Sequence, residues 1–447
     1  MALSRRQFFT LAGAGAATAV LASPLKALYA KQARGHSVYG GGYGQLVPDP
    51  NGLLDLPQGF QYRAFSRTGD IMSDGNPVPA DHDGMAAFPG ANNTVILVRN
   101  HEVSPTETDR PGVIAPANKM YDANNRGGTT TLIVGPNRDL ISHYASLAGT
   151  NRNCAGGPTP WGSWISCEEN TDTPSKAPNL KSHGYNFEVP ANATGPVDPV
   201  PLVAMGRFNH EAIAVDPKTG IVYQTEDRGD GLFYRFIPNQ PGKLQAGGVL
   251  QALKIQGKPG VDTSNKSTAT IPVCQQMAAG WVTIDNPNPS TDTVRVEGYS
   301  KGAARFTRGE GIWYGNGEFY FTCTDGGVAK AGQVWRYVPG QTAQEGGTIE
   351  LFVEPNDPNI LDAPDNIVIA PTGDLFLCED GNNNQFVVGV TPNGQLYQFA
   401  RNAIKVGDSY SEFCGACFSP DGKTMFVNIQ NPGITFAIWG PWSSKAG

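Results

Sequence analysis

Short apolar runs alternate with turn residues from residue 83 to the end of the chain. Runs such as Ile221-Val-Tyr, Phe319-Tyr-Phe and Leu375-Phe-Leu are rich in β-branched and aromatic residues and too short for helices. The turns, such as Asp216-Pro-Lys-Thr-Gly220 and Ser419-Pro-Asp-Gly422, carry residues that accept the backbone angles of tight hairpins. The pattern therefore predicts a series of β-hairpins and little helix.

Six of these hairpins share one pattern. Each opens with an acid or a cysteine, crosses two apolar runs joined by a turn, and closes with polar or acidic residues. The opening residues are Asp83, Cys154, Glu211, Glu310, Asp365 and Cys414. The closing residues are Glu102, Glu169, Asp227, Asp325 and Asp380, and the sixth repeat closes with Asn428-Ile-Gln-Asn431. A period of roughly 50 residues made of short strands is typical of a β-propeller. We therefore expect an all-β fold, a six-bladed β-propeller.

The repeat predicts one propeller domain over residues 31–447, with long inserted loops. The step between the third and fourth opening residues is the longest, and it contains a stretch rich in proline, glycine, asparagine and serine over residues 239–292. We expect this stretch to be an insertion beyond the blade. The length of 447 residues does not require several domains, because large β-architectures often exceed the usual domain size.

The first 30 residues have the pattern of a targeting segment. Arg5 and Arg6 precede Phe8 and Phe9, and an apolar stretch of small residues follows. This order predicts a Tat signal peptide over residues 1–30, read by the Tat export machinery. The alternative is a membrane helix, but the apolar run is shorter than the roughly 20 residues that span a bilayer. We expect a periplasmic or extracellular protein without a stable membrane anchor.

Composition narrows the classes of function and of metal site. Charged residues make up 16% of the chain, and 33 lysines and arginines against 40 acids leave a net charge of −7. Such a chain has no broad cationic face, so we expect no nucleic acid partner. The seven cysteines are odd in number, so at least one is outside any internal disulfide. Cys414 and Cys417 form a C-x-x-C, but no second pair has zinc-ribbon spacing.

A propeller brings equivalent positions of all its repeats to one central channel. The opening and closing residues would then form two rings of carboxylates, which repel one another unless cations lie among them. Carboxylate oxygens suit calcium, whereas a thiolate favours a transition metal, iron in particular. We therefore predict a metal centre and expect Cys154 to be a ligand, with a small buried core residue as the alternative. Cys167, Cys323 and Cys378 are expected in the core, while Cys414 and Cys417 could pair, fill the core or line the channel.

Three further side-chain types bear on the substrate. Arg308 lies two residues before Glu310, and its guanidinium would hold an anionic, oxygen-rich group such as phosphate, or else pair with the acidic ring. Asn100-His101-Glu102 and Asn209-His210-Glu211 repeat one tripeptide, so Asn100, His101 and His210 are candidates for substrate binding, with packing between blades as the alternative. No Ser-His-Asp motif is evident, and no phosphate-binding glycine loop of the G-x-x-x-x-G-K-[ST] type is present. Metals and an arginine suffice to hydrolyse a phosphate ester.

The ordered motifs resemble those of the PhoX-type alkaline phosphatases. They are Arg99-Asn-His-Glu102, Asn153-Cys-Ala-Gly-Gly157, Ser166-Cys-Glu-Glu-Asn170, Asn209-His-Glu211, Thr225-Glu-Asp-Arg-Gly229, Arg308-Gly-Glu-Gly311 and Asp362-Ala-Pro-Asp-Asn366. The resemblance covers nearly the whole chain after the signal. It implies a six-bladed propeller exported by Tat that hydrolyses phosphate monoesters outside the cytoplasm. It also implies a cluster of iron (Fe³⁺) and calcium, in which a cysteine holds the iron pair and an oxo group bridges metals.

Motif by motif, the resemblance also assigns roles to residues of this chain. Cys154 matches the iron-ligating cysteine, Glu169 and Glu310 match metal carboxylates, and Arg308 matches the arginine that contacts phosphate. Glu211, Glu226, Asp365 and Glu379 lie in matching motifs. The repeat favours Asp227 and Asp380 over their neighbours Glu226 and Glu379, although a bulge would turn the neighbour inward.

Two other functions are compatible with the same sequence features. One is a calcium-dependent lactonase or esterase on a similar propeller, which needs no iron-binding cysteine. The other is a secreted, non-catalytic propeller with structural metals. Iron content and the dependence of phosphatase activity on Cys154 separate these three functions.

Overall fold

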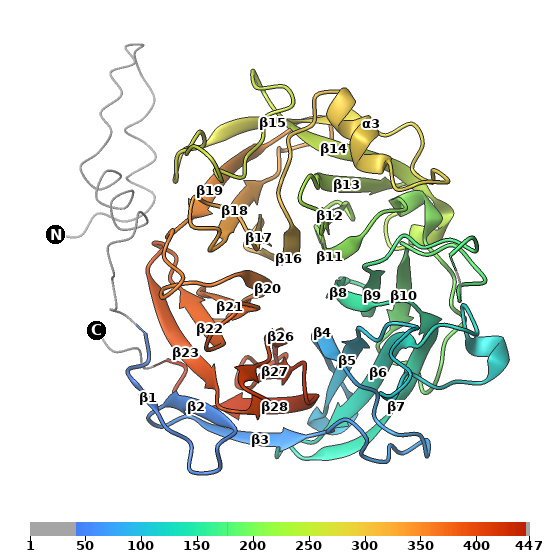
Figure 1. Cartoon of the computed structure of the whole chain (residues 1–447), viewed down its shortest axis with the longest axis vertical. Helices are drawn as coiled ribbons and strands as arrows, with labels where there is room; N and C mark the ends of the chain where they lie inside the picture. Colours follow the sequence, from blue (N-terminus) through green and yellow to red (C-terminus); the bar gives the residue numbers. More distant parts are fainter. Residues whose placement is uncertain (1–41, 177, 444–447) are drawn as a thin grey trace.

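The computed structural model describes residues 42–176 and 178–443, and in these residues the chain is almost entirely β-structure. The sheets are arranged radially around a central axis, in the manner of propeller blades (Figure 1). This confirms the prediction of an all-β, propeller-like fold. The predicted Tat signal over residues 1–30 lies outside the described residues.

The first two sheets follow one another along the chain. The first contains β4 (His82–Pro89), β5 (Val95–His101), β6 (Gly127–Val134) and β7 (Leu140–Thr150). The second contains β8 (Asn153–Pro158), β9 (Ser163–Glu168) and β10 (Asn186–Pro190). All strand pairs in both are antiparallel, and short turns join β4 to β5, β6 to β7 and β8 to β9.

The next two groups of strands are joined into one continuous sheet. The first group is β11 (His210–Val215), β12 (Val222–Glu226), β13 (Phe233–Pro238) and β14 (Gly248–Ile255). The second group is β16 (Gly309–Gly315), β17 (Glu318–Cys323), β18 (Gln333–Val338) and β19 (Thr348–Val353). The strand β15 (Met277–Thr283) pairs with both β14 and β19 and so connects them. The predicted insertion, residues 239–292, contains β14 and β15.

The last two sheets recruit strands from the beginning of the chain. One contains β20 (Pro364–Ile369), β21 (Leu375–Glu379), β22 (Phe386–Val390) and β23 (Leu396–Asn402), followed outward by β2 (Leu54–Pro57) and β1 (Leu46–Val47). The other contains β26 (Phe413–Phe418), β27 (Met425–Ile429), β28 (Ile434–Trp439) and β3 (Gln61–Phe65). Pairing of β28 with β3 ties the end of the chain to its beginning, which closes the ring of sheets.

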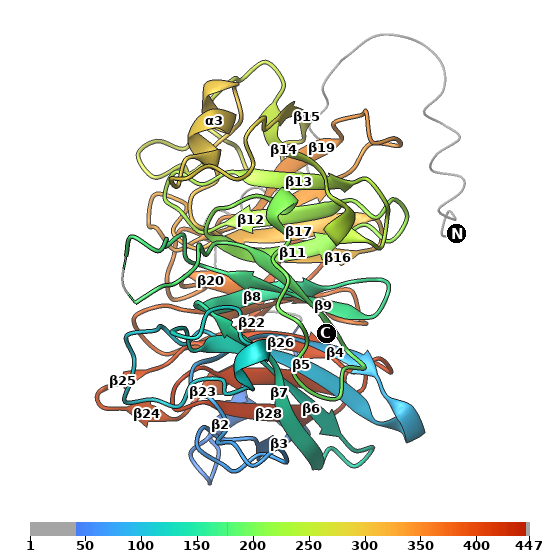
Figure 2. The ribbon, with the colours of Figure 1, turned by 90° about the vertical axis from the view of Figure 1, so that its right-hand side faces the viewer.

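Helical structure is sparse and lies in the connections. The helix α3 spans Val294–Ser300, and the 3-10 helices are η1 (Ala91–Asn93), η2 (Ala117–Lys119), η3 (Val203–Met205) and η4 (Leu244–Ala246). The hairpin of β24 (Lys405–Val406) and β25 (Ser409–Tyr410) projects from the same face of the ring as α3 (left in Figure 2). No helix in the described residues is long and apolar enough to cross a bilayer.

The predicted division into six separate blades is corrected by the hydrogen bonding. The strands form sheets of six, three, nine, four and four strands and a two-stranded hairpin. The reason is that β15 bridges two groups of strands, and that the group of β8 has only three strands. The innermost strands nevertheless form a closed cycle, in which β4, β8, β11, β16, β20 and β26 each contact the next and β26 contacts β4 (Figure 1).

The apolar core lies between neighbouring sheets rather than at the axis. Between the groups of β11 and β16, Phe233 stacks on Phe321 with ring centroids 4.4 Å apart, and Tyr223 packs on Phe319 at 4.3 Å. Each such aromatic side chain buries roughly 150–250 Å² of surface, which makes these contacts a large part of the packing energy. Because the apolar side chains pack between groups of strands, the starts of the inner strands near the axis carry mainly polar residues.

Candidate metal centre

Every inner strand is interrupted by a β-bulge close to its start. The register shifts lie between His82 and Met85, Asn153 and Gly156, His210 and Ile213, Gly309 and Ile312, Pro364 and Ile367, and Cys414 and Cys417. In the first five strands the first residue skipped by the pairing is Asp83, Cys154, Glu211, Glu310 or Asp365. A bulge bends the strand and re-aims the side chain of the extra residue. We call these five residues the ring residues.

Small residues after the ring residues allow the inner strands to approach closely. Gly84 follows Asp83, and a Cβ atom on it would lie 2.5 Å from the Cα of Ala155 in the next sheet. Gly311 follows Glu310, and a Cβ atom there would lie 2.8 Å from the Cα of Asn366. Larger residues would push the sheets apart, so the glycines fix how tightly the ring residues converge.

The sixth repeat differs from the prediction by one residue. Cys414 still pairs with Asn428, so Gly415 rather than Cys414 is the first residue skipped by the bulge. Gly415 has a φ of 65°, and a Cβ atom on it would lie 2.5 Å from the carbonyl oxygen of Asp83, which leaves room for glycine alone. The Cys414 thiol instead donates to the carbonyl oxygen of His82 at 2.8 Å. Cys414 and Cys417 are buried and form no disulfide, and Cys417 packs in the apolar core with Met85 and Phe426.

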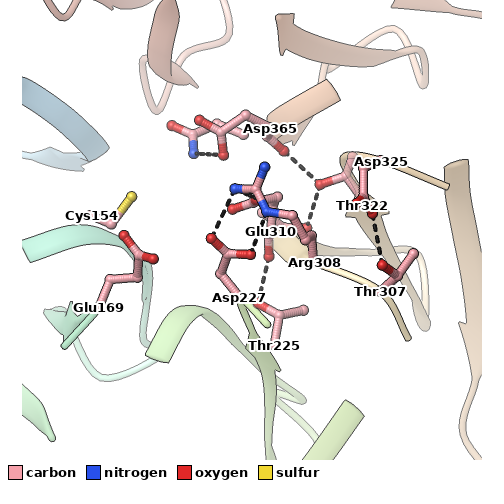
Figure 3. Close-up of polar contacts among 12 residues, drawn as sticks. Cys154, Glu169, Thr225, Asp227, Thr307, Arg308, Glu310, Thr322, Asp325 and Asp365 are labelled. Atoms are coloured by element: carbon pink, nitrogen blue, oxygen red, sulfur yellow. Dashed lines mark hydrogen bonds and ion pairs between the residues drawn. The ribbon is translucent and has the colours of Figure 1, made fainter. Parts of the chain in front are cut away.

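The closing acids form a second layer around the ring residues. Glu102, Glu169, Asp227 and Asp380 each directly follow a residue that is paired with the first residue of an inner strand. Asp325 does not belong to this layer, because Cys323 is the paired residue and Thr324 therefore takes the equivalent position. The Asp325 carboxylate pairs with Lys266 at 2.6 Å. It also accepts a hydrogen bond from Thr307 at 2.7 Å (Figure 3).

The neighbouring acids Glu226 and Glu379 bind loops instead of facing the ring. Glu226 accepts hydrogen bonds from the Tyr234 hydroxyl at 2.8 Å and the Leu232 amide at 3.2 Å. Glu379 accepts hydrogen bonds from the amides of Asp362 and Phe386 at 2.8 and 3.0 Å. Burial raises the pKa of both carboxyls to about 8. The structure therefore separates each pair of adjacent acids, with Asp227 and Asp380 on the side of the ring.

Three overlapping groups of ring and closing residues could each hold a cation. They are Asp83, Glu102 and Cys154; Cys154, Glu169 and Glu211; and Glu211, Glu310 and Asp365, with one ligand atom of each residue within 4.8 Å of the others. Because Cys154 and Glu211 are shared, the groups form one continuous cluster across the axis. Figure 3 shows Cys154, Glu169, Glu310 and Asp365 around this space.

The electrostatics of the cluster favour cations strongly. Burial raises the pKa of Glu211 well above its usual value, and the neighbouring Glu310 and Asp365 raise it further. Both carboxylate oxygens of Glu211 are buried and have no hydrogen-bond partner among the described residues. An ionised carboxylate without a partner costs several kcal/mol in such surroundings. Burial also raises the pKa of the Cys154 thiol, aided by Asp83 and Glu211, and a bound metal would reverse this. The carboxylates of this cluster therefore suit hard cations, and the Cys154 thiolate suits a softer transition metal.

Arg308 lies at the edge of the cluster, in reach of both layers. Its Nε and Nη2 atoms donate to the two oxygens of Asp227 at 2.8 and 2.9 Å, and Nη2 also donates to Glu310 at 2.9 Å (Figure 3). Burial alone would lower the pKa of Arg308, but the hydrogen bond with Asp227 and the charge of Glu310 outweigh it and raise the pKa. Its side chain is 40% exposed, so solvent and small molecules can reach the guanidinium.

Sequence reasoning missed several polar groups at the cluster, among them Arg152, Gln430 and Glu412, whose carboxyl interacts with Asp380 and Asp365. Arg152 pairs with Glu102 and with Glu169, the latter at 2.8 Å. It lies two residues before Cys154, the same offset that singled out Arg308 before Glu310, so the signal was present in the repeat. Gln430 donates to Glu102 at 2.9 Å and to Asp83 at 3.3 Å.

Asn100, His101 and His210 do not lie where a substrate could touch them. His101 is fully buried, and its ring nitrogens bond to the Ala80 carbonyl and the Thr130 hydroxyl at 2.7 and 2.9 Å. His210 is buried against Phe208, with ring centroids 3.7 Å apart. Asn100 is buried and bonds to backbone carbonyls. Each tripeptide uses its histidine for packing, because only the residue within or beyond the bulge turns to the axis.

Comparison with solved structures supports the same fold. The PhoX of Pseudomonas fluorescens, in complex with the transition-state analogue vanadate, superimposes with a TM-score of 0.68 at 19% identity over 90% of this chain and 98% of that one. A virginiamycin B lyase from Staphylococcus aureus (TM-score 0.38, 13% identity, 85% and 99% coverage) and a gluconolactonase from Xanthomonas campestris (0.40, 13%, 89% and 98%) are too distant to inform function.

The family assignment comes from the sequence as a whole. No curated protein matches this chain. The family model described as "Alkaline phosphatase PhoX" matches residues 41–433, which is most of the chain and includes every ring and closing residue. The chain therefore belongs to the PhoX family of alkaline phosphatases, metal-dependent hydrolases that act on phosphate esters.

Proposed function

We propose that this protein hydrolyses phosphate monoesters outside the cytoplasm, using ferric iron and calcium held by the ring and closing residues. One observation carries the proposal. Glu211 has a fully buried carboxylate without a hydrogen-bond partner, and it lies between Cys154 on one side and Glu310 and Asp365 on the other. A cation is the partner that such a carboxylate requires.

The chemistry of the donors suggests how the metals divide. Cys154, with Glu169 and Glu211, offers a thiolate beside carboxylates and would hold iron, since a soft ligand selects a transition metal. Glu211, Glu310 and Asp365 offer only oxygen and would hold calcium. Asp83 and Glu102 would complete the set on the far side of Cys154. When bound, the metals act as Lewis acids that offset the charge developing on the phosphoryl oxygens.

The residues of the chain supply orientation and further charge. Arg308 is fixed by Asp227 and Glu310, and its Nη1 donates to no acceptor among residues 42–176 and 178–443. We assign it to the binding of the phosphate group, where a planar guanidinium can donate to two oxygens at once. Donors aimed at the phosphoryl oxygens before the reaction begins are effective because they need no reorganisation.

The proposal includes export and a six-repeat architecture. The twin arginines Arg5 and Arg6 and the short apolar run after them support Tat export to the periplasm or the cell exterior. The cycle of β4, β8, β11, β16, β20 and β26 supports six radial units within one domain over residues 31–447, since each contributes one bulged inner strand.

Elemental analysis combined with hydrolysis of p-nitrophenyl phosphate tests this function. We expect purified protein to contain iron and calcium and to release phosphate. Cys154→Ser should lose iron and activity, whereas Cys417→Ser, which changes another buried thiol away from the cluster, should retain both. A protein that binds calcium without iron and cleaves a lactone irrespective of Cys154, or that binds metals and cleaves no phosphate ester, would contradict the proposal.

A further inference from the structure

Side chains on the second strand of one radial group of strands hydrogen-bond to the backbone of a ring residue in the next group around the axis. The Asn100 amide donates to the carbonyl oxygen of Cys154 at 3.1 Å, and the Asn428 amide donates to that of Asp83 at 2.8 Å. The hydroxyls of Thr225 and Thr322 donate to the carbonyl oxygens of Glu310 and Asp365 at 2.5 and 2.6 Å (Figure 3). We propose that these four clamp residues, Asn100, Thr225, Thr322 and Asn428, position the metal ligands by locking the bulges that carry them.

The clamped carbonyls are those that the bulges remove from regular pairing. Asp83, Cys154, Glu310 and Asp365 are skipped by the pairing of their own inner strands. A buried carbonyl without a partner is costly, so each needs a hydrogen-bond donor from elsewhere. Each clamp residue supplies this donor from the preceding group of strands. A bulge that slipped by one residue would lose this bond and turn the ligand side chain away from the axis.

The orientation of the Asn100 amide is fixed by its own partners. Its side-chain oxygen accepts hydrogen bonds from the Trp164 indole and the Ser166 hydroxyl, both at 2.9 Å. The amide nitrogen must therefore face the carbonyls of Cys154 and Ala155, at 3.1 and 2.6 Å. Asn100 thus acts on the bulge of Cys154 from a buried site that no substrate reaches.

Asn428 is held in the same way, and its network joins the last sheet to the first. Its oxygen accepts from the Thr435 hydroxyl at 2.6 Å, and Thr435 accepts from Arg99 at 2.7 Å. Arg99 is fully buried and lies on β5, in the same sheet as Asp83. The chain of donors from Arg99 through Thr435 and Asn428 to Asp83 therefore gives this buried arginine a role in fixing a metal ligand.

Thr225 and Thr322 each hold the carbonyl of a ring residue through the one proton of their hydroxyl group. The Thr225 hydroxyl accepts from the Ala212 amide at 3.1 Å, and it lies 3.3 Å from the Ala212 carbonyl but 2.5 Å from that of Glu310, so its proton is assigned to the shorter contact with Glu310. The Thr322 hydroxyl lies 3.3 Å from the Gly311 carbonyl but 2.6 Å from that of Asp365, so the shorter contact dominates. Replacing either threonine by valine removes this bond while keeping a β-branched side chain, and in Thr225→Val the Ala212 amide loses its acceptor as well.

The inference rests on the proposed metal centre, and metal retention tests it. Thr225→Val and Thr322→Val are compared with Thr225→Ser and Thr322→Ser, which keep the hydroxyl. Thr131→Val is the matched control, because Thr131 is buried and its hydroxyl has no partner among the described residues. The metal-loaded proteins are dialysed against graded EDTA, and iron and calcium are measured, together with Tm in saturating metal.

We expect both valine variants to lose metal at roughly tenfold lower EDTA than the wild type, as partners that orient metal ligands commonly do when removed. The serine variants should retain metal like the wild type, and a cooperative thermal transition in saturating metal should show that each variant is folded. Metal retention by the valine variants equal to that of Thr131→Val would overturn the inference. Should a valine variant fail to fold, loss of metal from its folded serine counterpart would overturn it as well. A wild type that binds no metal would instead refute the proposed function.

Discussion

Arg152 and Arg308 occupy equivalent places in two repeats of the ring. Each lies two residues before a ring residue, each has a positive φ, 50° and 45°, and each pairs with two acids of the cluster. A left-handed backbone is uncommon for a residue with a long side chain and indicates that the surrounding structure imposes it. The two guanidiniums therefore flank the metal cluster from the sheets of Cys154 and Glu310.

Replacing Arg308 by lysine should lower kcat/KM for a phosphate ester by about 10²-fold while leaving metal content unchanged. Lysine keeps the charge but cannot donate in the forked geometry. Arg152→Lys should lower kcat/KM in the same direction if its guanidinium also faces the phosphate. Steady-state kinetics with parallel metal analysis distinguish this from metal loss, and unaltered kcat/KM in Arg308→Lys would contradict the role given to Arg308.

Glu211→Gln should have opposite effects on metal binding and on the stability of the metal-free protein. The amide is a poor ligand, so iron and calcium should both be lost. Without metal at pH 8, however, the variant should be more stable than the wild type by about 1–3 kcal/mol, because folding of the wild type must keep a proton on buried Glu211 that the unfolded chain releases at this pH. Urea unfolding in excess EDTA measures this difference. A destabilised variant would mean that Glu211 has a favourable protein partner.

Asp325→Asn should leave iron and calcium content unchanged, whereas Asp365→Asn should reduce it. The reason is that Asp325 is neutralised by Lys266 and accepts from Thr307, outside the layer of closing acids. Both variants remove one negative charge, so each controls for the other. Loss of metal in Asp325→Asn to the same extent as in Asp365→Asn would show that Asp325 also acts on the metal centre, as the repeat predicts.

The metal-free protein should become less stable as pH rises from about 4 to 8. Burial raises the pKa of Asp380 to about 6, while burial and like charges raise the pKa of Asp83, Glu211, Glu310 and Asp365 well above their usual values. In this pH range the folded state keeps protons that the unfolded state releases, so rising pH favours unfolding. Tm measured against pH in EDTA should fall, and saturating iron and calcium should reduce the slope. A flat profile without metal would contradict the mutual repulsion of the acids.

The repeat of apolar runs, turns and acids allowed a large part of the fold to be predicted. Hairpin turns and β-branched runs are local signals, and their regular recurrence indicated a propeller-like, all-β arrangement before any contact was known. The same recurrence placed Asp83, Cys154, Glu211, Glu310 and Asp365 at equivalent positions, and the structure brings these five together at the axis. Such positions can be predicted because a radial fold converts equal places in a repeat into neighbours.

Register and bulges were decided only by the tertiary structure. The repeat favoured Asp227 over Glu226, but it could not exclude a bulge that would exchange them. It also could not exclude Asp325 in favour of Thr324, or replace Cys414 by Gly415 in the sixth repeat. A shift of one residue turns a strand side chain to the opposite face, and the bulge that sets this shift depends on contacts with the neighbouring sheet. The composition of the ring is therefore a property of the sequence, whereas the choice between adjacent acids arises from how closely six inner strands pack around one axis.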